Sequence, residues 1–163
     1  MKIGSKIVYP MHGAGTIVKI EQEDFFGERK EYCTVKVAQK EMTLKFPLDR
    51  RESLHIRNVS SMEKILDEIS SHKPEEYIYS PNWNKRYQTT LDKMKTGSPS
   101  DMATVLVNLK SLENTKGLSS GERQLYHNAM DILASELMLI RDCDYDGAYE
   151  ILEKHLEETL CEI

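Results

Sequence analysis

The sequence is poor in the features that mark secreted or membrane proteins. Its 163 residues include only three cysteines, and Cys33, Cys143 and Cys161 are widely spaced. An odd number of distant cysteines suits free thiols in a reducing compartment better than a disulfide framework. No apolar run approaches the roughly 20 residues that cross a bilayer. The start, MKIGSKIVYP, lacks the apolar stretch and cleavage site of a signal peptide. We therefore expect a cytoplasmic protein without a membrane segment.

Motifs of catalysis and metal binding are also missing. The five histidines are scattered, and neither HExxH nor CxxC occurs, so a zinc site has no support. The sequence contains no GxSxG, no Walker A loop and no dinucleotide-binding fingerprint. HGAG at residues 12–15 fits a turn between strands, and Cys33 lies in an alternating segment where a core residue is expected. We expect no enzymatic activity, no metal and no cofactor.

The net charge of −5 conceals a segregation along the chain. Residues 82–127 carry seven Lys/Arg and four Asp/Glu, whereas residues 128–163 carry two and ten. The basic block could contact a polyanion although the whole chain is acidic, and the acidic segment should limit indiscriminate binding to nucleic acid. The alternative is that both are ordinary solvated surface.

Residues 1–57 show the alternation of apolar and polar residues that is typical of strands. The pattern is seen in KIVY, GTIVKIEQ, EYCTVKVA and EMTLKFP, which are residues 6–9, 15–22, 31–38 and 41–47. Glycines in HGAG and FFGER supply the freedom that tight turns need. Five short strands in about 60 residues predict a small, strongly curved antiparallel barrel of the SH3-like or Tudor-like kind.

From residue 59 the apolar period becomes helical. Helices are predicted over about 60–72, 83–95, from 99 onward, 120–140 and 145–160. Asn82, Ser98 and Ser119 stand where N-caps belong, and Ser119 with Glu122 predicts a capping box. Residues 73–81 contain two prolines and predict a linker or a bend. The fold class is therefore α+β, with a β-barrel domain over residues 1–58 and a compact all-α bundle over residues 59–163.

Trp83, the single tryptophan, has two interpretations. Trp83, Tyr87, Leu91 and Met94 share one helix face, which makes Trp83 the first core residue of that helix. A residue in the first turn can also project past the core. An apolar wedge beside basic residues, at a helix N-terminus that favours phosphate, is typical of proteins that unstack bases. The spacing alone leaves both open.

Several segments together resemble the CarD/CdnL family of bacterial transcription regulators. They are IGSKIVYPMHGAGTIVKIE, KEYCTVKVA, MTLKFP, NWNKRY and GLSSGE, which follow the family order and span nearly the whole chain. The β segment is also similar to the polymerase-binding domain of the transcription-repair coupling factor, a much larger helicase without this helical tail. The resemblance implies a Tudor-like domain that docks on the RNA polymerase β subunit.

The same resemblance implies that the helical domain reaches promoter DNA at the upstream edge of the melted bubble. There a tryptophan enters the minor groove with low sequence specificity and hinders reclosure. Through NWNKRY and SSGER, the implied DNA-binding residues are Trp83, Lys85, Arg86 and Arg123. The implied polymerase-binding residues, at the family's basic position and beside it, are Lys45, Thr43, Glu23 and Phe25.

This chain departs from the family pattern at three places. Glu23 stands where some relatives have an arginine, Gln88 stands where a lysine can occur, and residues 128–163 are unusually acidic. These departures predict weaker binding to DNA. The competing hypothesis is a pure protein-interaction module with an acidic helical docking surface and a core tryptophan. We expect a monomer, in which residues 73–81 could act as the hinge of a domain-swapped dimer.

Overall fold

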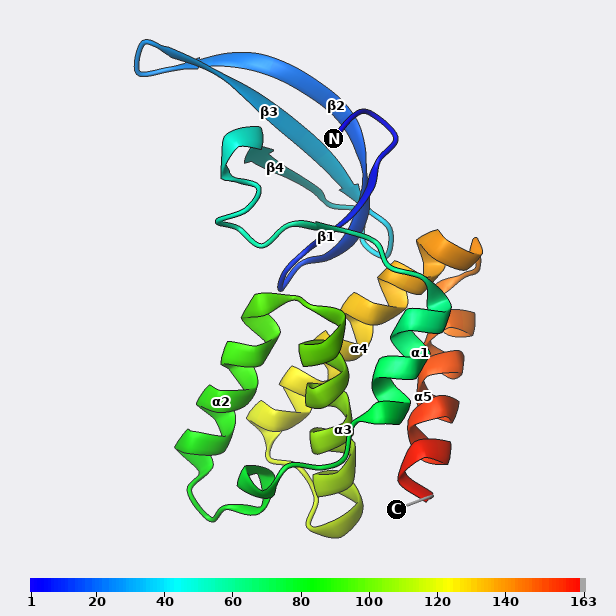
Figure 1. Cartoon of the computed structure of the whole chain (residues 1–163). Coiled ribbons are helices and arrows are strands. Elements are labelled where there is room, and N and C mark those ends of the chain that lie inside the picture. The colour runs from blue at the N-terminus through cyan, green and yellow to red at the C-terminus, as the bar shows by residue number, and fades with distance from the viewer. Residues whose placement is uncertain (162–163) are drawn as a thin grey trace.

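The computed structural model describes residues 1–161, apart from the side chain of Phe25. An antiparallel sheet precedes five α-helices, as the sequence predicts, and lies above them in Figure 1. The strands are β1 (Lys6–Tyr9), β2 (Gly13–Phe25), β3 (Glu28–Val37), β4 (Thr43–Pro47) and β5 (Arg57–Asn58). The α-helices are α1 (Met62–Ser71), α2 (Trp83–Thr96), α3 (Pro99–Thr115), α4 (Ser120–Arg141) and α5 (Tyr145–Cys161). Two short 3-10 helices, η1 (Leu48–Arg50) and η2 (Glu76–Tyr79), complete the elements.

The sheet has the strand order β4-β3-β2-β1-β5, so β4 and β5 are its edges. The register of β2 against β3 shifts between Ile17 and Lys19, and such a bulge bends a strand. β2 and β3 extend further at their hairpin end than the sequence predicted. The added residues are mostly charged (Glu23, Asp24, Glu28, Arg29 and Lys30) and carry no alternation that marks them as strand. Cys33 is fully buried in the sheet core, as expected.

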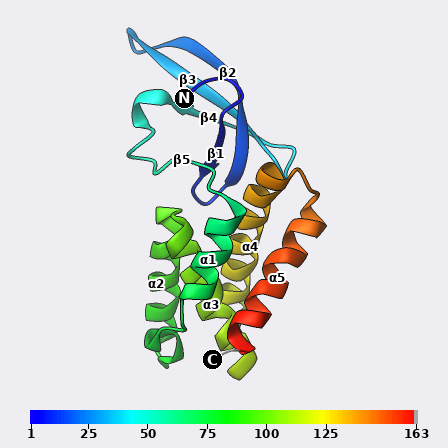
Figure 2. The ribbon, with the colours of Figure 1, turned by 45° about the vertical axis from the view of Figure 1, so that its right-hand side comes forward.

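The helices begin where the capping residues indicated. The side chains of Asn82, Ser98 and Ser119 each accept a hydrogen bond from the backbone N–H three residues on. α3 is the central helix, in contact with the other four, and α5 packs against α1, α3 and α4 (Figure 2). No helix within residues 1–161 combines the length and apolar character that crossing a membrane requires.

Residues 73–81 are not a bare linker. They form η2, whose Ile78 is buried, and they are tied to α3 by side-chain hydrogen bonds. Asn108 accepts from the Glu75 backbone at 2.8 Å, and the hydroxyls of Tyr79 and Ser111 are 2.6 Å apart. The expectation of a hinge for domain exchange stays a prediction, and this packing would have to open first.

The sheet and the helices share a core. Val8 and Ala14 of the sheet belong to the same apolar cluster as the helical residues. The Ala14 backbone N–H donates to Ser135 Oγ at 2.8 Å. At Gly97, which ends α2 with φ +66°, an added Cβ would lie 2.7 Å from the Pro10 ring, so the β1–β2 turn sits directly on this helix end. The two parts are therefore in firm contact.

A buried ion pair lies at this junction. The Arg57 guanidinium donates to both carboxylate oxygens of Glu136 at 2.8 Å each. The Ser60 backbone N–H and hydroxyl donate to the same carboxylate at 2.7 and 2.8 Å, and Arg57 Nε donates to the Gly97 carbonyl. The Glu136 side chain is fully buried. A buried charge is tolerated when it is paired and hydrogen-bonded, and Glu136 meets both conditions.

Candidate nucleic-acid and partner surfaces

Trp83 is the first residue of α2 and lies outside the apolar core. It is 40% exposed, whereas Thr90 and Met94 on the same helix face are buried. Its ring stacks on Tyr87 with centroids 5.0 Å apart and planes at 22°. The indole N–H donates to Ser119 Oγ at 2.8 Å. The core interpretation is thus wrong for the ring itself: one side is held and the rest faces solvent.

The first turn of α4 supplies the support for this ring. A Cβ added at Gly121 would lie 3.1 Å from Trp83 Cζ2 and 3.3 Å from Tyr87 Cε2. A side chain larger than glycine would therefore press on the stacked pair. Sequence reasoning missed this role of Ser119 and Gly121. The available signal was the small-residue run of GLSSGE, which predicts a helix start and belongs to the family resemblance but does not indicate a contact with Trp83.

Arg86 does not face outward as a free cation. Its guanidinium pairs with both carboxylate oxygens of Glu122 and donates to the Ser80 carbonyl at 2.6 Å. Its side chain is 15% exposed. The expectation that Arg86 contacts DNA stays a prediction, and the contact would have to be made by a guanidinium that already has partners within the chain. The reason for this pairing is electrostatic, because Glu122 is almost fully buried and needs a matching charge.

Glu122 also changes the expected capping box. Ser119 caps the Glu122 backbone N–H at 3.2 Å, as predicted, but the Glu122 carboxylate accepts from the Ser119 hydroxyl and from Arg86. Burial alone would raise the pKa of Glu122. The hydrogen bonds from Arg86 and Ser119 outweigh burial and hold this pKa below its usual value. Trp83, Ser119, Glu122 and Arg86 therefore form one connected network.

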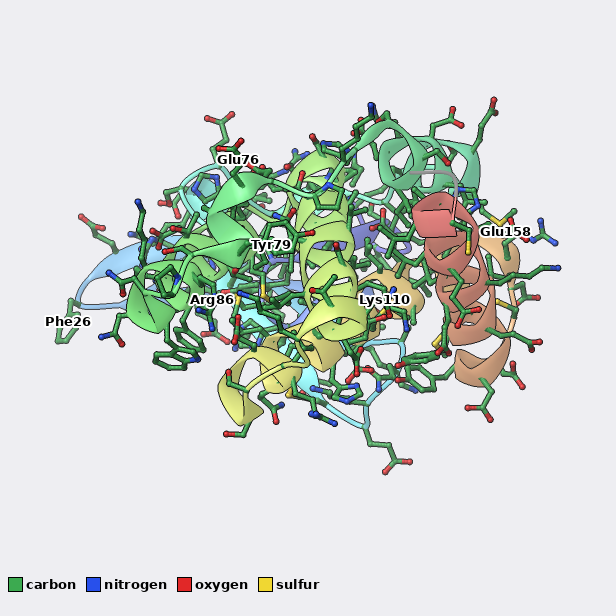
Figure 3. The ribbon with its side chains drawn as sticks, turned by 90° about the horizontal axis from the view of Figure 1, so that it is seen from below. Phe26, Glu76, Tyr79, Arg86, Lys110 and Glu158 are labelled. Carbon is green, nitrogen blue, oxygen red and sulfur yellow. The ribbon has the colours of Figure 1, made fainter. Side chains whose placement is uncertain are left out.

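Two cations near Trp83 point into solvent. Lys85, two residues on in α2, and Arg123, in the first turn of α4, are both exposed. Neither side chain forms a hydrogen bond or ion pair with any residue in the range 1–161. The structure thus brings three of the four predicted DNA residues to one end of the helical part as outward-facing groups. Figure 3 shows the fourth, Arg86, beside that end of α2.

The predicted polymerase residues lie in the sheet, Thr43 and Lys45 on the edge strand β4 and Glu23 and Phe25 on β2 (Figure 1). Lys45 forms an ion pair with Glu23, and its ammonium lies 5.5 Å from the centre of the Tyr32 ring. The hydrogen bond with Glu23 raises the pKa of Lys45. Thr43 is exposed on β4. The acid at position 23 therefore neutralises the base at position 45.

The outer edge of β4 offers backbone groups. The Val37 N–H donates to the Met42 carbonyl, and the alternation of an antiparallel ladder then turns the N–H and C=O groups of Thr43 and Lys45 away from β3. Phe25 is the predicted site residue whose side chain lies outside the described part. Its neighbour Phe26, at the tip of the β2–β3 hairpin, is 93% exposed (Figure 3).

Comparison with known proteins gives one family for both parts. Residues 1–60 match the family model of the CarD-like/TRCF RID domain, and residues 64–153 match that of the CarD C-terminal domain. The chain is also 34% identical over 142 residues to a Bacillus subtilis (strain 168) protein named "Putative transcription factor YdeB". That alignment covers 86% of this chain and 92% of the relative.

Proposed function

The chain belongs to the CarD/CdnL family of bacterial transcription regulators, and from this we propose a specific, non-catalytic function. It docks on the β subunit of RNA polymerase and stabilises promoter open complexes by inserting Trp83 into the minor groove at the upstream edge of the melted DNA. The observation that carries the proposal is the half-exposed indole, which is held on one side by Ser119 and Tyr87 beside the exposed Lys85.

A held indole is well suited to act as a wedge. Ordering a side chain on binding costs up to about 1.5 kcal/mol, and the stack on Tyr87 and the bond to Ser119 reduce this cost beforehand. Unstacking a base step costs a few kcal/mol, but at the edge of a melted bubble the polymerase has already met part of it. A net contribution of about 1.4 kcal/mol shifts the ratio of open to closed complexes tenfold.

The exposed cations can support the wedge but cannot provide tight binding alone. Lys85 and Arg123 can neutralise about two phosphates, too few for strong binding at physiological salt. Docking on polymerase would supply a high effective concentration instead. Because such residues contact the DNA backbone and depend on the shape of the groove, we expect low sequence specificity.

The docking surface we propose is the free edge of β4, which would accept a strand of the polymerase β subunit. The outward backbone groups of Thr43 and Lys45 would then carry most of the contact. The Lys45 charge contributes less here, because Glu23 already satisfies it.

The first experiment measures the lifetime of promoter open complexes on the cognate polymerase. Wild-type protein should lengthen the lifetime, and Trp83→Ala should abolish the effect at nearly unchanged thermal stability. Trp83→Phe, which keeps an aromatic ring but loses the N–H, should retain part of it. Ile3→Ala, a truncation of another exposed apolar residue, is the matched control. An unchanged lifetime with Trp83→Ala would refute the wedge.

Docking is tested separately with Thr43→Pro. Proline removes an N–H that points out of the sheet, so it should disturb the ladder little. We expect polymerase binding to fall sharply in a pull-down while thermal stability is nearly kept. Wild-type binding by Thr43→Pro would exclude strand addition at this edge and leave the wedge untouched.

A further inference from the structure

A second surface lies on α5, away from β4. A shallow hollow of about 430 Å³ is lined by His127 of α4 and by Tyr145, Asp146, Tyr149, Glu150 and Glu153 of α5. A smaller hollow of about 220 Å³ adjoins it and shares His127, Tyr149 and Glu153. The rings of Tyr145 and Tyr149 lie with centroids 5.8 Å apart. The floor is therefore aromatic and the rim is acidic.

The acids of this rim have no cationic partner. Asp146, Glu150 and Glu153 follow i, i+4 and i+7 on one face of α5, and Glu157 continues this row outside both hollows. Among the described residues none of them forms an ion pair. Like charges at this spacing repel each other and destabilise a helix by a few tenths of a kcal/mol per pair. A cation bound along this face would relieve the repulsion.

Tyr126 lines the smaller hollow with a hydroxyl that has no hydrogen-bond partner in the described chain. The residue is only 5% exposed. Among the described residues, Thr90 Oγ1 is the one side-chain polar atom that has no hydrogen-bond partner and is also fully shielded from solvent. The Tyr126 hydroxyl, which has no partner either, is therefore not fully shielded. The Tyr126 oxygen therefore opens into the hollow that it lines. A nearly buried hydroxyl in this state can accept from, or donate to, an incoming polar group.

The arrangement also indicates the kind of ligand. Within the described residues, no three His, Cys, Asp or Glu side chains converge to hold a metal ion. The acids instead extend along α5 for roughly 16 Å, at 1.5 Å per residue. Tyrosine faces favour a planar guanidinium, and carboxylates bind it with two parallel hydrogen bonds. Lys110 and Arg123 also line the smaller hollow. Figure 3 shows Lys110 on the side of α3 that faces α5.

We propose that this surface, the α5 tyrosine–acid face, binds an arginine-bearing basic segment of a partner protein. One arginine lies against the Tyr145 and Tyr149 rings beside Glu150 and Glu153, and the segment continues along α5. Tyr126 supplies a hydroxyl to the bound side chain. The inference does not depend on DNA or polymerase binding.

In the test, the full-length protein is titrated with an (Arg-Gly)4 peptide whose termini are uncharged. The heat of binding is measured by isothermal titration calorimetry. The peptide in which citrulline replaces arginine has the same shape without charge, and (Lys-Gly)4 has charge without the guanidinium. We expect binding of the arginine peptide to weaken about tenfold with Glu153→Gln, the loss of one charge-assisted contact. Tyr126→Phe should weaken binding while leaving thermal stability unchanged or higher, because it removes a hydroxyl without a partner.

Glu158→Gln is the matched control, since Glu158 is an exposed acid near the end of α5 outside both hollows (Figure 3). It should bind the arginine peptide like wild type. Equal weakening by Glu158→Gln, or equal binding of the citrulline or lysine peptide, would overturn the proposal in favour of diffuse attraction. Concentration-dependent sedimentation of the protein alone, lost in Glu153→Gln, would overturn it in favour of a second copy as the occupant.

Discussion

The ion pair between Arg57 and Glu136 provides the sharpest test of how the sheet is joined to the helices. Arg57→Ala removes a guanidinium that makes two 2.8 Å bonds to a fully buried carboxylate. The Ser60 N–H and hydroxyl remain, but the negative charge is then buried without a counter-charge. Removing one partner of such a pair costs about 3–5 kcal/mol. In a chain of this length that lowers the melting temperature by roughly 6–20 °C.

Other substitutions at Arg57 and Glu136 should lower the free energy of unfolding by less than Arg57→Ala does. Glu136→Gln removes the charge, and the Arg57 side chain, which is 20% exposed, can turn toward solvent, so we expect a loss of about 1–3 kcal/mol. Arg57→Met with Glu136→Met leaves no unpaired charge and should be more stable than Arg57→Ala alone. The control is Arg50→Ala at an exposed position of η1, which should change stability by less than about 0.5 kcal/mol.

Urea denaturation followed by far-UV circular dichroism measures these free energies. Trp83 fluorescence, which reports on the helical part, should give the same midpoint in the wild-type protein because both parts share a core. The reasoning is refuted if Arg57→Ala lowers the free energy of unfolding no more than Arg50→Ala does. It is also refuted if the loss in the double substitution equals the sum of the losses in Arg57→Met and Glu136→Met measured singly.

Four further predictions concern single residues. Gly121→Ala should displace the indole, change Trp83 emission and shorten open-complex lifetime, with a change in stability of at most about 1 kcal/mol. The pKa of Glu122 is lowered in the folded protein, so its contribution to stability is present above the usual value of 4.5 and is lost as pH falls below it. Acid denaturation curves should show this loss in wild type and not in Glu122→Gln. Glu23→Ala should free Lys45 and tighten polymerase binding a few-fold at low salt, an effect that added salt abolishes in a binding titration. Thr90→Val replaces a sealed, unpartnered hydroxyl and should stabilise the protein by about 1 kcal/mol in thermal melts.

Features set by neighbours in the chain could be predicted from the sequence. Asn82, Ser98 and Ser119 cap helices through bonds to residues only three positions away, so local spacing identifies them. The apolar periods gave the buried faces of α3 and α4 for the same reason. Strands β1 to β4 follow from alternation, whereas the two-residue β5 carries no such pattern and the hairpin end of β2 and β3 was underestimated.

Features that join distant segments could not be predicted. Arg57 and Glu136 are 79 positions apart, and nothing near Arg57 distinguishes it from a solvated base. Arg86 and Glu122 are 36 positions apart, so local spacing does not reveal that a cation assigned to DNA by the resemblance is also paired within the chain. The exposure of Trp83 likewise depends on where the first turn of α4 arrives, which helical periodicity does not encode.

The junction also has a consequence for the proposed wedge. A buried ion pair stabilises a fold little compared with apolar residues of similar size, so we infer that its main effect is on the geometry of the junction. Here it joins β5 to α4 while the Pro10 turn rests on Gly97, and we expect these contacts to limit motion of the sheet relative to the helices. If the helices moved freely relative to the sheet, inserting Trp83 into DNA while the sheet is docked would cost the conformational entropy of that motion. The double substitution Arg57→Met with Glu136→Met should therefore keep polymerase affinity and much of the stability, yet shorten open-complex lifetime. A wild-type open-complex lifetime in that variant would show that the function does not depend on a rigid connection between the sheet and the helices.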